Sequence, residues 1–183
     1  SVLHPRGEKG AAKEPAAVEA RSRDMVYEES ANRIVYTGDV EIRQGDILII
    51  HTGYHHFGWD SPYANEVRYM VQHPGPDREF ADWAKAKKLR WIGVDCGSAD
   101  HPMNTIIRDW MPRQERQADK VFKKKYGMPV ADFFDDSKYQ LMHLEMFPYG
   151  IIHAECLGGE LDLLLNRRVT IGMFPWRFVD GES

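Results

Sequence analysis

The sequence predicts an α/β fold, in which strands and helices alternate along the chain. The apolar segment ILIIHTG, residues 47–53, ends in glycine and is typical of a buried strand. An amphipathic helix is predicted over 77–89, and its apolar stripe consists of Phe80, Trp83, Ala84 and Leu89. A second buried strand, RWIGVDCG, follows at 90–97. A strand, a helix and another strand in this order make up the repeating unit of α/β folds.

The other segments continue this alternation. Residues 54–76 combine aromatic and polar residues with glycine and proline, which predicts a long loop containing a short helix. After the strand at 90–97, a helix interrupted at Pro112 is predicted over 105–127. Further downstream, the sequence predicts in turn a strand, a short helix and a last strand, at 149–158, 158–168 and 169–178. Residues 1–33 are rich in Ala, Lys, Glu and Arg and predict a loose polar arm or a solvated helix.

Composition excludes several classes of function. The chain has 183 residues, enough for one domain, and its net charge of −4 argues against a nucleic-acid-binding protein. It contains no apolar run near the roughly 18 residues that a membrane span requires. Cys96 and Cys156 form no CxxC pair, so we expect two reduced, buried thiols in a cytoplasmic protein.

Glu155 is the first candidate for a functional residue. In an extended segment Ile151, His153 and Glu155 share one face, and a buried, ionised carboxylate needs a compensating partner. His143 lies twelve residues upstream, and Pro148 and Gly150 allow the chain to turn back between them. A histidine and a glutamate that converge in this way can bind Zn²⁺ or Mn²⁺. The alternative is a buried hydrogen bond between them without a metal.

The segment HTGYHHFGWD, residues 51–60, is a second candidate, with His51, His55, His56 and Asp60 as possible ligands. Histidines four residues apart bind a metal when they lie on a helix, but Gly53 and the preceding strand argue against a helix here. The segment can instead be a polar loop with Trp59 on a pocket wall, or it can contact a substrate. Asp95 and Asp100 lie at the end of the second predicted strand, in VDCGSAD, and a turn cap is the expected role of Asp100. We interpret His73 and His101, which each precede a proline, as loop residues.

Four stretches in a fixed order resemble the metal-dependent cyclase/hydrolase family that includes bacterial kynurenine formamidase and isatin hydrolase. They are GDILIIHTGY, HPGPDREFADWAKAKKLRWIGVDCGSAD, HLEMFPYGIIHAECLGGELDLLL and RRVTIGMFPWRF, and they lie within residues 40–183. The resemblance implies a swivelling β/β/α fold over 34–183. It also implies hydrolysis of a small amide, lactone or cyclic imide with one or two Zn²⁺ or Mn²⁺ ions, with His143 and Glu155 as two of the metal ligands. Under this hypothesis His55, His56 and Trp59 contact the small-molecule substrate.

The family's signature, His-Gly-Thr-His-x-Asp-x-Pro, is absent from this sequence. By resemblance it supplies the remaining metal ligands and, shortly after, the general base. The family also continues past FPWRFVDGES into one more strand. We therefore expect an incomplete fold, with a second chain or segment that completes the site in a homo- or hetero-oligomer and covers the arm at 1–33.

Three alternatives remain open at the level of sequence. The chain can be a non-catalytic subunit or binding module that keeps the fold without its metal. The histidine-rich loop at 51–60 can have replaced the missing ligands. Ser1 can also be the nucleophile of a self-cleaving hydrolase, although no neighbouring residue supports that chemistry.

Overall fold

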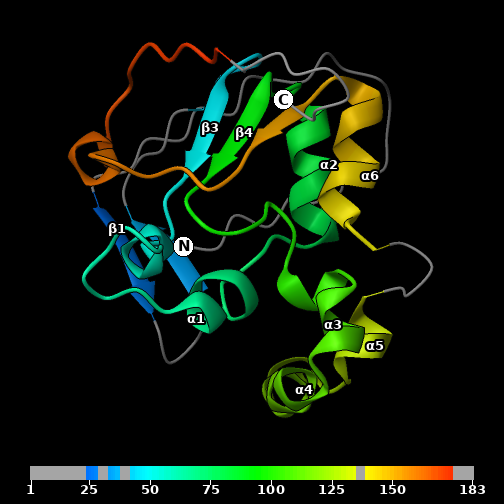
Figure 1. Ribbon diagram of the computed structural model, residues 1–183. Helices are drawn as coiled ribbons and strands as arrows, with labels where there is room; N and C mark the ends of the chain where they lie inside the picture. The colour runs from blue at the N-terminus through cyan, green and yellow to red at the C-terminus, as the bar shows by residue number, and fades with distance from the viewer. Residues whose placement is uncertain (1–23, 29–32, 38–41, 135–138, 175–183) are drawn as a thin grey trace, which may run out of the picture.

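A three-stranded parallel sheet forms the centre of the structure (Figure 1). The computed structural model describes residues 24–28, 33–37, 42–134 and 139–174. Strand β4 (Trp91–Val94) lies between β3 (Ile47–Ile50) and β5 (Ile152–Ala154). Neighbouring parallel strands need long crossover connections, and both connections in this sheet carry helices. The structure therefore has the mixture of strands and helices that the predicted α/β class requires.

The strands differ in how deeply they are buried. All four residues of β4 are buried, which confirms the strand predicted at 90–97, whereas the residues of β3 are half-buried. Gly93 of β4 leaves no space for a side chain, since a Cβ there would lie 2.5 Å from Cδ1 of Ile49 and 2.7 Å from Cδ1 of Leu157. The segment predicted at 47–53 is thus a strand, but not a fully buried one.

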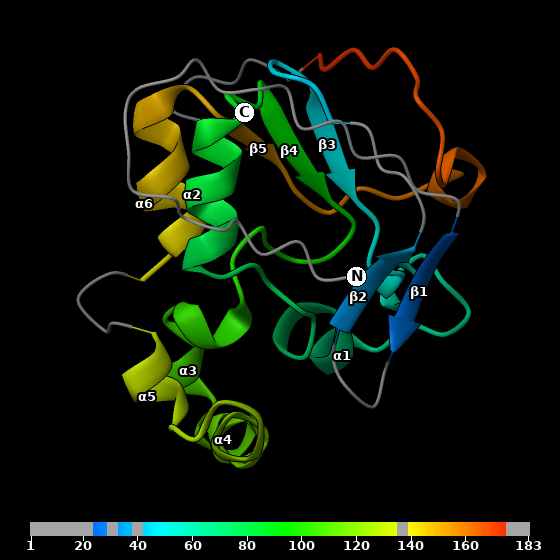
Figure 2. The same ribbon diagram turned by 180° about the vertical axis from the view of Figure 1, so that it is seen from behind.

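Helices α2 (Arg78–Ala86) and α6 (Leu141–Met146) pack against each other beside β5, as both views show (Figures 1 and 2). Helix α2 begins after Asp77, whose side chain accepts a hydrogen bond of 3.0 Å from the backbone nitrogen of Phe80. The predicted helix is confirmed, although it ends three residues earlier than expected. The core between the helices and the sheet includes Ala81, Ala84, Leu89, Ile92, Val94, Met142, Met146 and Ile151.

A second, smaller core lies below the sheet in Figure 1, among η3 (Pro102–Asn104), α3 (Ile107–Trp110), α4 (Pro112–Tyr126) and α5 (Val130–Phe133). The predicted interruption of the helix is confirmed, because Pro112 is the first residue of α4. The buried residues of this core are Val71, Met103, Phe122, Val130 and Phe134.

The connection between β3 and α2 contains two short helices, where the sequence predicts one. Helix η2 (Tyr54–Phe57) carries the paired histidines, and α1 (Glu66–Val71) follows it. Asn65 caps α1 by accepting a hydrogen bond of 3.0 Å from the backbone nitrogen of Arg68.

After β5 the chain forms less regular structure than the sequence predicts. The short helix predicted at 158–168 is present as a single 3₁₀ turn, η6 (Leu161–Leu164). A similar turn, η5 (Phe147–Tyr149), lies on the other side of β5, between α6 and the strand. The strand predicted at 169–178 is wrong over 169–174, where the described residues pair with no strand, and its remainder lies outside the described residues. The segment instead runs along a groove beside β3, anchored at its start by an ion pair between Arg168 and Asp46.

Strands β1 (Asp24–Glu28) and β2 (Arg33–Thr37) form a separate antiparallel pair in which Asp24 lies opposite Thr37. Strand β1 falls inside the predicted polar arm at 1–33, and the rest of that arm lies outside the described residues. In the part of the chain that the structure describes, no helix combines the length and the apolar character needed to cross a membrane.

Candidate metal centre

His143, His153 and Glu155 come together at the C-terminal end of β5, and we call them the Glu155 group. One potential ligand atom from each lies within 4.8 Å of the others. His143 comes from α6, His153 from β5, and Glu155 directly follows that strand. The C-terminal ends of parallel strands are where α/β proteins place their binding sites.

Asp100 orients His143. Its carboxylate is 1% exposed and accepts two hydrogen bonds, of 2.6 Å from Nδ1 of His143 and 2.7 Å from the backbone nitrogen of Met142. A carboxylate at Nδ1 places the imidazole proton there, so Nε2 of His143 is turned toward Oε1 of Glu155, 3.6 Å away. Asp100 therefore fixes the first turn of α6 and the histidine on it, instead of capping its own turn as the sequence suggests.

Glu155 is held by the loop that follows β4. Its Oε1 accepts a hydrogen bond of 2.7 Å from the backbone nitrogen of Ala99 and one of 3.2 Å from the hydroxyl of Ser98. The side chain is 29% exposed, so it is half-buried and not buried as the strand pattern predicts. These donors compensate part of the carboxylate's charge and fix one of its oxygens.

His153 lacks such support. Within the described part of the chain, both of its ring nitrogens are buried without a hydrogen-bond partner. Burial, reinforced by the neighbouring His143, lowers the pKa of His153 to about 4, although Asp100 opposes this shift. Its ring packs on those of His143 and Phe147, with both pairs of centroids 4.7 Å apart. Buried polar nitrogens without a partner are rare in folded proteins, and the neutral imidazole is the form of histidine that binds a metal.

Two ion pairs hold α6 against α2 and so support the position of His143. Glu145 lies 2.8 Å from Nζ of Lys85 and also pairs with Arg78. The hydrogen bonds from Lys85 and Arg78 lower the pKa of Glu145 to about 2.

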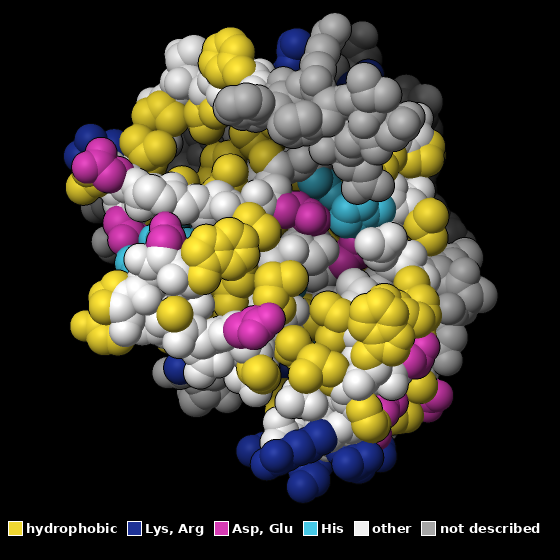
Figure 3. Space-filling view, viewed as in Figure 1, with side chains coloured by type: hydrophobic (Ala, Val, Ile, Leu, Met, Phe, Trp, Pro, Cys, Tyr) yellow, Lys and Arg dark blue, Asp and Glu magenta, His cyan; other side chains and the backbone are white. Residues whose placement is uncertain are grey.

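The residues predicted to contact substrate lie elsewhere. His55 and His56 are on η2, where their Nε2 atoms lie 3.6 and 3.2 Å from Oδ2 of Asp162, and Trp59 is 86% exposed. Figure 3 shows two separate places where histidine side chains lie beside acidic ones on this face of the molecule. The histidines of η2 are thus gathered around Asp162, which the sequence did not single out because it lies more than a hundred residues away.

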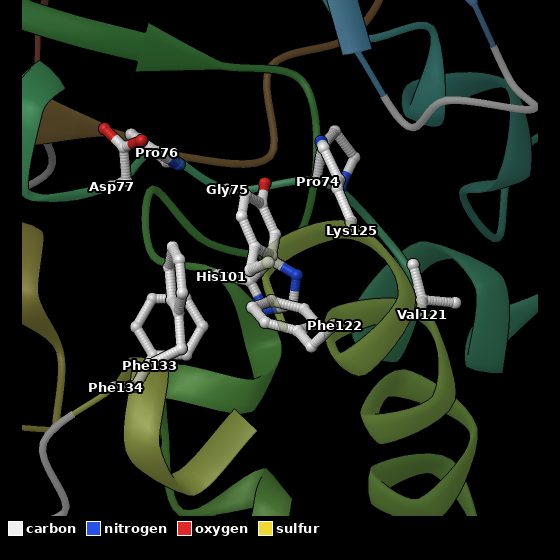
Figure 4. Close-up of a pocket in the computed structure, with 11 residues that line it drawn as sticks. Pro74, Gly75, Pro76, Asp77, His101, Val121, Phe122, Lys125, Phe133 and Phe134 are labelled. Atoms are coloured by element: carbon white, nitrogen blue, oxygen red, sulfur yellow. The ribbon is translucent and has the colours of Figure 1, made fainter. Parts of the chain in front are cut away.

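His101 and His73 are packing residues. His101 lies between aromatic rings in a small pocket (Figure 4), with its centroid 5.5 Å from that of Phe122 and 5.3 Å from that of Phe134. Burial lowers the pKa of His101 to about 3 and that of His73 to about 4, so both are neutral near pH 7. Both lie in loops, as the sequence predicts; His73 is buried and His101 is half-buried. Of the two cysteines, Cys96 is buried as expected and Cys156 is exposed.

A comparison with known families gives one match. Residues 13–101 match the model of a family described as “Putative cyclase”. The sequence of this segment, which is just under half of the chain, is similar to that family. The finding agrees with the resemblance seen in the sequence and favours an enzyme. Comparisons with curated proteins and with solved structures found no match.

The cyclase-family match covers part of the sites described above. It begins inside the predicted polar arm, whereas the four stretches that carry the resemblance lie within residues 40–183. It includes β3, η2, β4 and Asp100, and it ends at His101. The Glu155 group lies beyond it, so the geometry of that group is independent support for a metal centre.

Proposed function

We propose that this chain is the metal-binding part of a cyclase-family hydrolase that opens a small amide, lactone or cyclic imide. The observation that carries the proposal is the Glu155 group, in which His153 has two buried nitrogens without a partner among the described residues, beside His143 and a half-buried carboxylate. We propose the swivelling β/β/α arrangement of that family as the complete fold.

The residues present fit a divalent cation. Two imidazoles and one carboxylate form a donor set that suits Zn²⁺ and Mn²⁺, and one of the two orphaned nitrogens of His153 gains a partner when a cation binds. A cation held there supplies Lewis-acid chemistry, since it polarises a carbonyl and lowers the pKa of a bound water.

The chain's own residues prepare this site. Asp100 holds His143 in one tautomer, and the backbone of Ala99 fixes Glu155. Phe147 packs on both histidine rings and reduces access of water to them. Each of these contacts reduces the reorganisation needed when a cation binds.

The general base of the reaction must come from elsewhere. Within the described residues of this site, both carboxylates are already engaged, Asp100 by His143 and Glu155 by Ala99. A further chain or segment that carries a base and the remaining ligands would complete the active site, in keeping with the absent signature.

The missing signature also favours a second candidate function, a non-catalytic subunit that keeps the fold without a metal. Metal content separates the two. We would purify the protein with its natural partners, identify every polypeptide by denaturing mass spectrometry, and measure bound Zn and Mn by elemental analysis.

Variants link the metal to the site and to activity. Glu155→Gln removes the ligand charge at constant size and should weaken metal binding at least about 10-fold, with a parallel loss of hydrolysis of model formamides, lactones and cyclic imides. Glu160→Gln, an exposed glutamate five residues downstream, serves as the matched control. If Glu155→Gln binds as many metal ions as the wild type, with unchanged affinity, this site is refuted. A metal-free, inactive complex would establish the non-catalytic subunit.

A further inference from the structure

A second set of potential metal ligands lies at the end of β3, outside the Glu155 group. His51 directly follows β3, His55 lies on η2, and Asp162 lies on η6, and we call these residues the Asp162 group. One potential ligand atom from each lies within 4.8 Å of the others. His56, which is 53% exposed, adds a third imidazole with its Nε2 3.2 Å from Oδ2 of Asp162.

Asp95 prepares His55 in the same way as Asp100 prepares His143. It is fully buried, and its Oδ2 accepts hydrogen bonds from the backbone nitrogen of Gly53 and, at 2.9 Å, from Nδ1 of His55. The proton of the imidazole therefore sits on Nδ1, and Nε2 presents a lone pair toward Asp162. Metal-binding histidines typically have such a carboxylate behind them.

Nε2 of His55 is the independent observation that points to a ligand. The side chain is only 9% exposed, and in the described structure this nitrogen is buried without a hydrogen-bond partner. The nearest carboxylate oxygen, Oδ2 of Asp162, lies 3.6 Å away, beyond hydrogen-bond distance. A metal-free arrangement leaves this lone pair buried and unsatisfied, which is unfavourable.

The separations in the group suit a small cation. Oδ1 of Asp162 lies 2.7 Å from Nε2 of His51, and Oδ2 lies 3.6 Å from Nε2 of His55. Ligands held about 2.0–2.2 Å from one tetrahedral Zn²⁺ lie roughly 3.3–3.5 Å from each other, so small side-chain rotations suffice. Imidazole nitrogens favour Zn²⁺ and similar transition metals over Mg²⁺ or Ca²⁺.

We propose that His51, His55 and Asp162 form a second transition-metal site of the Zn²⁺ class, separate from the Glu155 group, with His56 available as a fourth ligand. The site joins η6 to the end of β3 and ties together segments 111 residues apart in the sequence. It gives His55 and His56 a role different from the substrate contact predicted from the sequence.

Zinc stoichiometry tests this proposal. We would dialyse the full chain against Zn²⁺ and measure bound zinc per chain for the wild type, His55→Ala, Asp162→Asn and His143→Ala. The expected result is two zinc ions in the wild type, one in His143→Ala, and one in His55→Ala. In Asp162→Asn one of the two ions should bind at least 10-fold more weakly. Asp60→Asn changes an exposed carboxylate near the same loop and should still bind two.

The outcomes separate this proposal from the proposed function. Asp162 is 46% exposed, so Asp162→Asn should fold even if His55→Ala does not. Wild-type zinc binding in Asp162→Asn overturns the second site. A single ion that His143→Ala removes and Asp162→Asn does not affect also overturns it, while the proposed function stands. A single ion with the reverse response supports the second site and refutes the Glu155 group as the metal centre.

Discussion

Asp100→Asn should weaken metal binding at the Glu155 group without unfolding the protein. The substitution keeps an oxygen for the backbone nitrogen of Met142 but removes the charge that faces Nδ1 of His143. The asparagine can also present its NH₂ group to the ring, which favours the wrong tautomer. Nε2 of His143 then carries the proton and no longer offers a lone pair toward Glu155.

The expected effect follows from this geometry. Loss of a carboxylate behind a metal-binding histidine costs about 10- to 100-fold in metal affinity, which corresponds to about 1.4–2.7 kcal/mol. The hydrogen bond is short, at 2.6 Å, and Asp100 is 1% exposed, so solvent screens it little and we expect the upper half of this range.

The assay is competition for Zn²⁺ against a chromophoric chelator, performed in a His55→Ala background so that the Glu155 group is read alone. Asp132→Asn on α5 is the control, since this residue is exposed and belongs to a different helix from His143. Circular dichroism establishes that both variants are folded. A folded Asp100→Asn variant that binds zinc within twofold of its parent would refute the orienting role of Asp100.

Three further predictions concern stability. Burial lowers the pKa of His101 to about 3, so the unfolded chain takes up a proton at this histidine below pH 6.5 while the folded protein does not. The contribution of His101 to the free energy of unfolding should therefore be constant above pH 6.5 and fall by about 1.4 kcal/mol per pH unit between pH 6.5 and about 3. When the free energy of unfolding is measured with urea at several pH values, it should depend less steeply on pH in His101→Phe than in the wild type over this range. An equal pH dependence in the two proteins would contradict the prediction. Gly75→Ala should destabilise by about 1–3 kcal/mol, because a Cβ there would lie 2.2 Å from backbone atoms of His101, whereas Gly158→Ala, with open space around it, should not. Glu145→Gln should lower the free energy of unfolding by about 1 kcal/mol at pH 7. Because the pKa of Glu145 is lowered to about 2, the difference between variant and wild type should disappear as the pH falls from 4.5 through 2. Thermal unfolding of both proteins at pH 7 and pH 2 measures this difference.

Local periodicity is what made parts of the fold predictable. The apolar stripe of α2 and the continuous apolar run of β4 each depend on neighbours within a few residues, and both were confirmed. The same period placed His153 and Glu155 on one face of a strand, and the structure does bring them together. The sequence could have named His153 as a third member of that group from this spacing alone.

Pairing between distant segments was not predictable in this way. The apolar residues at 169–174 suit a strand, but a strand needs a partner, and the described residues offer none at that place. Asp162 shows no local sign of its role, because His51 lies 111 residues upstream. Asp100 looked like a turn cap until the fold placed His143 against it.

The sequence alone determined the class of the fold, its central elements and the residue types that could bind a metal, because these depend on composition and short-range spacing. Only the tertiary structure decided which histidine meets which carboxylate, and which nitrogens are left buried without a partner. Those outcomes depend on contacts among β3, β4, β5 and the loops at their ends, which the chain makes only when it folds.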